Sequence, residues 1–182
     1  MKPAWSTVRE TFWSGGLIAY PTEAVWGLGC DPWDETAVQR LLTLKQRPVE
    51  KGLILVAGNW KTLDPLLAHL SQAQKTTLIH SWPGPITWLI PVPSFVPPWI
   101  TGGRDTVAVR LSAHPLIREF SQQVGVPLVS TSANRTGARS ARHGFQVRKW
   151  FGNDIDLYLG GRVGGAAQPS TIRDLHSGET LR

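Results

Sequence analysis

Cysteine and long apolar runs are nearly absent from this sequence. Cys30 is the single cysteine in 182 residues, so an intrachain disulfide is excluded and a cysteine-based zinc site is not expected. No apolar stretch has the length of a transmembrane helix, and residues 1–13 are polar and aromatic, unlike a signal peptide. We therefore predict a cytoplasmic protein that does not enter a membrane.

The signatures of several common enzyme sites are missing as well. The sequence contains no P-loop motif, no GxSxG nucleophile motif and no HExxH zinc motif. Its five histidines lie far apart without the spacing of metal ligands, so we predict no protein metal site. Any use of ATP must then follow a mode other than that of P-loop enzymes.

The residues that are present describe a globular protein rich in turns. Apolar residues make up 41% and charged residues 18% of the chain, and its length suits one domain over residues 1–182. The 18 glycines and 14 prolines favour loop-built sites over a helical bundle. The formal charge of +6 either attracts a polyanion such as a nucleotide or a nucleic acid, or serves solubility alone.

Hydrophobic periodicity predicts alternating strands and helices, which indicates an α/β fold around a mixed sheet. We expect strands at residues 17–20, 53–57, 86–92, 106–111, 126–129, 157–159 and 171–174, and a strand or a turn at residues 25–30. We expect helices near a Thr7–Glu10 capping box, from Asp34, between Leu63 and Ile79 with Ser71 as a cap, from His114-Pro115 and near Phe145. Pro21 should stop strand pairing, residues 93–103 should form a surface loop, and the basic segment 135–148 is a candidate lid.

Three polar clusters lie at the ends of predicted elements. Pro21-Thr22-Glu23 either positions a substrate or is a turn with a solvated Glu23, and its composition alone favours the turn. Lys45-Gln46-Arg47 either clamps a triphosphate or complements a helix dipole. The hydroxyls of residues 130–134 either hold phosphate and ribose oxygens or belong to an ordinary turn.

Arg110 lies within the apolar run 107–111. A buried cation is costly unless it is paired. We therefore expect Arg110 either to form a structural ion pair or to point at an anionic ligand such as a carboxylate.

Five segments together have the order and spacing of one known family. They are YPTEAVWGLG at 20–29, LKQRP at 44–48, WPGPIT at 82–87, VRLSAHP at 109–115 and STSAN at 130–134. In this respect the chain resembles the YrdC-like family, in its short bacterial TsaC form, over nearly its whole length. The resemblance implies a single α/β domain with a twisted mixed sheet, flanking helices and a concave basic face.

The resemblance also implies an activity. Members of this kind are nucleotidyltransferases that form L-threonylcarbamoyladenylate and pyrophosphate from L-threonine, bicarbonate or CO2, and ATP. Other proteins then transfer the threonylcarbamoyl group to tRNA, which gives N6-threonylcarbamoyladenosine. Mg²⁺ is the expected companion of ATP, and tRNA or double-stranded RNA is a further candidate partner.

Nine residues of this chain fall on the family's site. The resemblance assigns catalysis and triphosphate binding to Lys-x-Arg and Ser-x-Asn residues, which here are Lys45, Arg47, Ser132 and Asn134. Further nucleotide contacts are expected from Ser130 and Ser170. The expected threonine contacts are Thr22, Thr131 and Arg110, the last through the substrate carboxylate.

Two positions differ from longer family members. Lys51-Gly52 stands where those members have Asn-Pro, and the strand end Val56-Ala57-Gly58 lacks their histidine. We therefore expect fewer threonine contacts from this strand.

Two rival functions stay open on the sequence alone. A non-catalytic protein would hold double-stranded RNA or tRNA on the same basic face through its phosphates. A maturation factor for a hydrogenase or a carbamoyltransferase would use a similar domain, but the sequence shows neither zinc-finger cysteines nor an accompanying domain.

Overall fold

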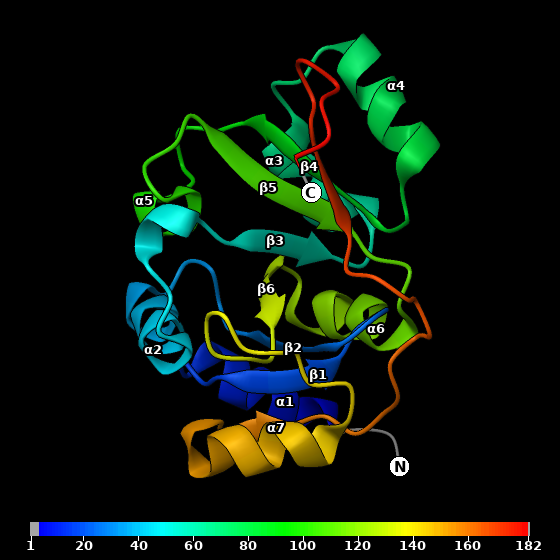
Figure 1. Cartoon of the computed structure of the whole chain (residues 1–182). Helices are drawn as coiled ribbons and strands as arrows, with labels where there is room; N and C mark the ends of the chain where they lie inside the picture. The colour runs from blue at the N-terminus through cyan, green and yellow to red at the C-terminus, as the bar shows by residue number, and fades with distance from the viewer. Residues whose placement is uncertain (1–3, 182) are drawn as a thin grey trace.

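An eight-stranded mixed sheet forms the centre of the molecule, in the order β7-β1-β2-β6-β3-β5-β4-β8 (Figure 1). The computed structural model describes residues 4–181. The strands are β1 (Ile18–Pro21), β2 (Trp26–Gly29), β3 (Ile54–Ala57), β4 (Ile86–Pro91), β5 (Thr106–Leu111), β6 (Leu128–Ser132), β7 (Leu157–Tyr158) and β8 (Thr171–Asp174). The α-helices are α1 (Trp5–Trp13), α2 (Glu35–Lys45), α3 (Trp60–Leu67), α4 (Gln72–Ser81), α5 (Pro98–Thr101), α6 (Pro115–Val124) and α7 (Gly144–Phe151), and the short 3-10 helices are η1 (Val49–Lys51) and η2 (Gly152–Asp154). The predicted α/β fold with a mixed sheet is confirmed.

Two four-stranded halves of the sheet meet between β6 and β3. In the first half, β1 pairs antiparallel with β2 and parallel with β7, and β2 pairs antiparallel with β6. In the second half, β5 pairs parallel with β3 and antiparallel with β4, and β4 pairs parallel with β8. The antiparallel β3–β6 pair, in which Ile54 lies opposite Ser130, joins the halves. Segments far apart in the sequence therefore meet on one surface at this joint.

Alternating side chains give the sheet two different faces. On one face Leu55 belongs to the larger core, which α2, α3, α4, α5 and α7 help to form. On the other face Val56 packs with α1 and α6 in a smaller core. These two helices cover only part of the second face. Its remaining part, which includes Ile54, Arg110 and Ser130, lines an open cavity.

Several elements with a strong local signal lie where the sequence predicts them. Asp34 caps α2 by accepting a hydrogen bond from the Ala37 amide at 3.1 Å, and Ser71 caps α4 within a capping box. Helix α6 ends at Gly125, whose φ of 76° suits a residue without a Cβ atom. The bounds of β5 and β8 also agree with the prediction. Local chemistry alone is sufficient for these elements.

Two helix predictions are wrong because tertiary contacts override the local signal. Helix α1 begins at Trp5 rather than at a Thr7–Glu10 capping box, and no side chain caps it. Its start is instead tied to α6, since the Trp5 indole donates to Glu119 at 2.7 Å. Residues 93–103 are not all surface loop, because α5 forms within them and fully buries Ile100.

Two strand ends also differ from the prediction. Pro21 does not stop pairing before the strand end, because it is the last residue of β1 and still lies opposite Trp26. Strand β6 does not end at Val129 but continues to Ser132, which lies opposite Gly27 of β2. The first polar residues after Val129 are therefore fixed in the sheet rather than in a turn.

Candidate active site

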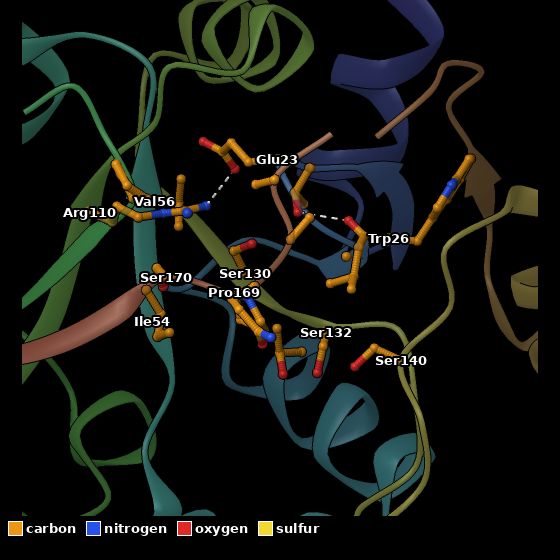
Figure 2. Close-up of a pocket in the computed structure, with 18 of the residues that line it drawn as sticks. Glu23, Trp26, Ile54, Val56, Arg110, Ser130, Ser132, Ser140, Pro169 and Ser170 are labelled. Atoms are coloured by element: carbon orange, nitrogen blue, oxygen red, sulfur yellow. Dashed lines mark hydrogen bonds and ion pairs between the residues drawn. The ribbon is translucent and has the colours of Figure 1, made fainter. Parts of the chain in front are cut away.

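A cavity of about 230 Å³ opens on the uncovered part of the second sheet face (Figure 2). Its walls come from the β1–β2 turn, β3, β5, β6, the loop after α2 and the segment before β8. Seven of the nine predicted site residues line it, and these are Thr22, Arg47, Arg110, Ser130, Thr131, Ser132 and Ser170. Lys45 and Asn134 do not line the cavity. Both form hydrogen bonds with Ser132, which does line it.

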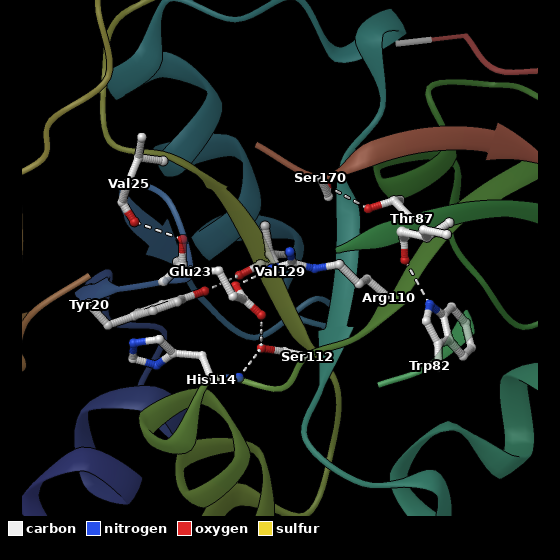
Figure 3. A network of polar contacts seen from close by, with 12 residues as sticks. Tyr20, Glu23, Val25, Trp82, Thr87, Arg110, Ser112, His114, Val129 and Ser170 are labelled. Carbon is white, nitrogen blue, oxygen red and sulfur yellow. Dashed lines mark hydrogen bonds and ion pairs between the residues drawn. The ribbon is translucent and has the colours of Figure 1, made fainter. Parts of the chain in front are cut away.

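The β1–β2 turn fixes Thr22 and Glu23 at the wall of the cavity. The Thr22 hydroxyl and the Thr22 amide both donate to the Val25 carbonyl oxygen, at 2.7 and 3.0 Å. This closed turn buries Thr22. It also directs the Glu23 carboxylate towards β5 (Figure 3).

Glu23 and Arg110 form an ion pair that is largely shielded from water. Arg110 Nη2 lies 3.0 Å from Glu23 Oε2, and the two side chains are 9% and 18% exposed. Ser112 Oγ donates to Glu23 Oε1 at 2.6 Å (Figure 3). A structural ion pair, one of the two alternatives predicted for Arg110, is therefore present. The alternative that Glu23 is a solvated residue of a turn is wrong. The Nε atom of Arg110 is buried and has no hydrogen-bond partner within residues 4–181, so this guanidinium keeps an unused donor.

The Arg110 charge keeps Glu23 ionised. Burial by itself raises the pKa of Glu23, but the Arg110 charge and the Ser112 hydrogen bond outweigh it, and the pKa lies below its usual value. The Ser112 hydroxyl is oriented to donate to Glu23, because its oxygen accepts a hydrogen bond from the His114 amide at 3.1 Å. The pair therefore presents a cation and an anion side by side at neutral pH.

Lys45 joins the two predicted phosphate-binding segments. It is the last residue of α2 and is 3% exposed. Its ammonium group donates to the carbonyl oxygen of Ser132 and, at 2.7 Å, to that of Asn134. Burial, aided by the nearby charge of Arg47, lowers the pKa of Lys45 to about 7. The structure thus brings the Lys-x-Arg and Ser-x-Asn residues together, with Lys45 behind the cavity wall.

Asn134 organises the loop that follows β6. Its Oδ1 accepts the Ser132 hydroxyl at 2.6 Å, and its Nδ2 donates to the Ala138 carbonyl at 2.7 Å. The Thr136 amide donates to the Lys45 carbonyl at 3.0 Å. Ser140, further along the predicted lid, lines the cavity (Figure 2). Closure of residues 135–148 over the cavity stays a prediction.

Arg47 lines the cavity from the loop after α2. Gln46 adopts φ of 51°, which turns the chain sharply at the end of the helix. The Arg47 guanidinium donates to the Gly52 carbonyl, at 2.8 Å from Nη2 and 3.3 Å from Nε. These bonds hold the cation at a fixed place beside β3.

The segment before β8 closes the cavity on another side. Its backbone runs over the β1–β2 turn, where the Gly164 amide donates to the Thr22 carbonyl and the Ala166 amide to the Glu23 carbonyl, both at 2.9 Å. At its end, the hydroxyls of Ser170 and Thr87 lie 2.8 Å apart (Figure 3). This places Ser170 on the cavity wall opposite the β1–β2 turn.

Sequence reasoning missed parts of this site. It gave no role to Ser112, although this residue lies two positions after Arg110 and so on the same side of the chain. It also missed the part of the wall formed by residues 164–167, which is defined by its contacts with the β1–β2 turn.

Within residues 4–181, no group of three or more histidine, cysteine or acidic residues is placed so that it could hold a metal ion. Among the described residues that line the cavity, Glu23 is the only carboxylate, and Arg110 already pairs with it. In the same residue range no helix has the length and apolar character needed to cross a membrane.

Sequence comparison places the chain among named relatives. The profile of the Sua5/YciO/YrdC family, described as telomere recombination, matches residues 10–182. A curated protein of Pseudomonas aeruginosa UCBPP-PA14 is 54% identical over 96% of this chain and 92% of its own length. One from Pseudomonas entomophila L48 is 52% identical over 93% of this chain and 91% of its own length. Both carry the name threonylcarbamoyl-AMP synthase.

Solved structures share the fold. P. abyssi Sua5 complexed with L-threonine superposes with a TM-score of 0.89 at 32% identity, and the match covers 100% of this chain and 55% of that one. This chain thus spans about half the length of the P. abyssi protein. E. coli YciO has the same fold, with a TM-score of 0.82 at 22% identity over 95% of this chain and 85% of its own. The family profile and these relatives together show that the chain belongs to the Sua5/YciO/YrdC family.

Proposed function

We propose that this chain forms L-threonylcarbamoyladenylate and pyrophosphate from L-threonine, bicarbonate or CO2, and ATP. The observation that carries the proposal is the single cavity that Arg110 and Arg47 both line. An enzyme of this kind must hold a carboxylate and a polyphosphate a short distance apart. The names of the curated relatives and the L-threonine complex of the P. abyssi structure support the same activity.

Threonine binds, in this proposal, at the Arg110 end of the cavity. The Arg110 guanidinium lines this cavity and receives the substrate carboxylate. Thr22 and Thr131 line the same cavity and contact the rest of the amino acid. The Glu23 carboxylate keeps Arg110 in place at 3.0 Å.

ATP binds with its phosphates towards Arg47 and Ser132. Arg47 supplies a planar cation and Ser132 a hydroxyl, and both line the cavity. Lys45 and Asn134 act from behind Ser132, since they hold its carbonyl and its hydroxyl. Ser130 and Ser170 lie on the walls between these groups and contact the nucleotide. The concave face is then basic where the phosphates lie.

The chemistry requires alignment more than a protein nucleophile. The neutral amine of threonine captures CO2 and releases a proton, which gives a carbamate. A carbamate oxygen then attacks the α-phosphorus of ATP, and the bond to the β-phosphate oxygen breaks as pyrophosphate leaves. Mg²⁺ enters as part of the ATP substrate, because the described residues that line the cavity include no cluster of carboxylates to hold it.

One assay tests the proposed function. The protein is incubated with ATP, L-threonine and bicarbonate, and the adenylate is sought by mass spectrometry while pyrophosphate is quantified. Both products must depend on threonine and on bicarbonate. Arg47→Ala should lower turnover by more than about tenfold, because it removes a fixed cation from the phosphates. Near-normal turnover of this variant, or no adenylate from the wild type, would end the proposal.

The wider setting is part of the same proposal. We place the protein in the cytoplasm, where its product reaches the proteins that modify tRNA. A non-catalytic protein for tRNA or double-stranded RNA is the second candidate, favoured only by the formal charge of +6. Such binding would weaken steeply with salt and would need no threonine, which separates it from the enzyme.

A further inference from the structure

Strand β3 contributes apolar side chains to the cavity, and these are Ile54 and Val56. The hydroxyl groups on the cavity wall come from other elements, among them Thr22 in the β1–β2 turn and Thr131 on β6. Val56 is only 1% exposed, because its side chain also packs in the smaller core with α1 and α6. The cavity therefore meets one apolar edge of a side chain that the core holds from behind (Figure 2).

Val56 is the direct neighbour of Arg110 across the sheet. The parallel pairing of β3 with β5 places Val56 opposite Arg110, on strands that lie about 4.8 Å apart. The Arg110 side chain crosses β3 to reach Glu23, because β3 and β6 separate β5 from the β1–β2 half of the sheet (Figure 3). Ile54 lies opposite Ala108, one row further along the strands. Val56 is thus the apolar side chain of β3 in the same row as the guanidinium.

Contacts on either side fix the position of Val56. The Ser112 amide donates to the Ala57 carbonyl at 2.9 Å, which continues the contact between the two strands beyond Arg110. Helix α6 lies so close to the end of β3 that a Cβ atom on Gly58 would be 2.2 Å from the Cα atom of Arg118. Val56 therefore forms a surface with little freedom to move. Such a surface can discriminate between ligands that differ by a single methyl group.

A threonine whose carboxylate meets Arg110 has its side chain beside Val56, because Cβ is only two bonds from the carboxyl carbon. The amine must stay free to capture CO2, so the side chain is the group that contacts the floor of the cavity. A hydroxyl against Val56 would lose its hydrogen bonds to water without a replacement, whereas a methyl group gains apolar contact there. The γ-methyl group of threonine therefore faces Val56, and its hydroxyl faces the polar walls.

We propose that Val56 contacts the γ-methyl group of bound threonine and makes the cavity select threonine over serine. This inference rests on the proposed function, because it takes the position of the threonine carboxylate from it. It gives a role to the strand from which the sequence predicts fewer threonine contacts, since β3 supplies an apolar contact instead of a polar one. One methyl group in an apolar pocket changes selectivity by about 10–200-fold, which binding measurements resolve.

The experiment measures the affinity of the full-length protein for three amino acids by calorimetry, and kcat/KM for adenylate formation from each. They are L-threonine, L-serine and L-allothreonine, the stereoisomer in which the methyl and hydroxyl groups on Cβ exchange places. The wild type should prefer threonine to both others by at least about tenfold. Val56→Ala should lower the threonine-to-serine preference about fivefold, because serine has no methyl contact to lose. Comparing ligands within one protein cancels any change in the folded fraction.

Two further variants are matched controls. Val8→Ala removes the same atoms from the same core, and Val8 is also 1% exposed but does not line the cavity. Ile54→Ala shortens the other β3 side chain, which lies one row away from Arg110. Both should keep the preference of the wild type for threonine over serine. Thermal melting verifies that all three variants fold.

The outcomes separate this inference from the function. If the wild type forms the adenylate but Val56→Ala keeps the wild-type preference, the methyl contact is wrong and the function stands. Equal wild-type affinity for threonine and L-allothreonine, or an equal loss of preference in Val8→Ala or Ile54→Ala, would also overturn the inference. If the preference depends on Val56 although no adenylate forms, the methyl contact stands and the function fails. A wild type that neither binds threonine nor forms the adenylate would end both.

Discussion

At the scale of single residues, Arg110 shows how one buried cation organises the wall of a cavity. A guanidinium in a buried strand is costly without a counter-charge. Glu23 supplies that charge from the other half of the sheet, and Ser112 orients the carboxylate at 2.6 Å. Glu23 therefore pairs with the buried cation and lines the cavity at the same time.

Glu23→Gln tests the structural role. At neutral pH it should lower the free energy of unfolding by about 1–3 kcal/mol, because it leaves Arg110 without its counter-charge. The pKa of Glu23 lies below its usual value in the folded protein. Its stabilising effect is therefore complete above the unfolded value of about 4.3 and is lost as the pH falls through the folded pKa.

Urea denaturation of the wild type and of Glu23→Gln at several pH values between 7 and 3 would measure this loss of stability. The free energy of unfolding is obtained by extrapolation, since it falls linearly by about 1–3 kcal/mol per molar urea. The two proteins should converge at the acid end. Glu50→Gln, which changes an exposed carboxylate, is the control. A difference that stays constant down to the acid end would show that the ion pair does not stabilise the fold.

Lys45 gives the opposite pH dependence. Burial, with help from Arg47, lowers the pKa of Lys45 to about 7, whereas an unfolded lysine titrates near about 10.4. Between these values the unfolded chain holds a proton that the folded protein has released, so a rise in pH favours folding. Below about pH 7 both forms are charged and the effect is constant.

The measurement compares the wild type with Lys45→Met by urea denaturation from pH 6 to 9. The free energy of unfolding of the wild type can rise by at most about 1.4 kcal/mol per pH unit through this one group. The stability of the wild type relative to the variant should grow above about pH 7. Lys149→Met removes an exposed lysine of α7 and should show no such change. Parallel pH curves for wild type and Lys45→Met would mean that the two carbonyl acceptors keep Lys45 charged.

At the scale of elements, the close packing of β2 against its neighbours positions the cavity wall. A Cβ atom on Gly29 would lie 2.2 Å from the Val129 carbonyl oxygen and 2.7 Å from the Tyr20 hydroxyl. Neither atom has space to move, because the Tyr20 ring is fully buried and its hydroxyl donates to the same carbonyl at 3.2 Å. Glycine is therefore needed where β1, β2 and β6 meet.

Gly29→Ala should separate β2 from β6 and lower the free energy of unfolding by about 3 kcal/mol or more. Gly160→Ala is the matched control, because Gly160, like Gly29, is not among the glycines with positive φ, but its Cβ atom would meet open space. It should change the free energy of unfolding by less than about 1 kcal/mol. Chemical denaturation of the two variants provides the comparison. Equal losses would show that the contact with Val129 and Tyr20 does not explain the effect.

The contrast between elements explains what the sequence could predict. The caps at Asp34 and Ser71 and the end of α6 at Gly125 follow from neighbouring residues, and the structure confirms them. The start of α1 and the extent of β6 depend on partners far along the chain, such as Glu119 and Gly27, and were predicted incorrectly.

The same limit applies to the site. Seven of the residues that line the cavity could be named from motifs, because these motifs lie at or beside the ends of strands and of α2. The ion pair of Glu23 could not, since it needs the register that places β1 and β5 across the joint between β6 and β3. Spatial pairings of this kind are absent from any local stretch of sequence.

At the scale of the whole molecule, the cavity spans the joint between the two halves of the sheet. The β1–β2 turn and β6 belong to one half, and β3 and β5 belong to the other. A ligand that touches both halves stabilises the folded protein as a unit, by an amount set by its concentration relative to its Kd. Threonine and ATP should therefore raise the melting temperature of the whole chain.

Arg110→Gln tests which part of this stabilisation comes from threonine. At about 100 times Kd a ligand adds about 2.7 kcal/mol, which for a chain of this size is a shift of about 5–10 °C. We expect the variant to lose most of the shift caused by threonine and to keep that caused by ATP, because the proposed function assigns the carboxylate to Arg110 and the phosphates to Arg47. Comparing shifts within each protein removes the effect of the variant on basal stability. Arg118→Gln, an exposed change on α6, should keep both shifts. If Arg110→Gln keeps its threonine shift or loses the ATP shift instead, the two ends of the cavity are assigned in the wrong order.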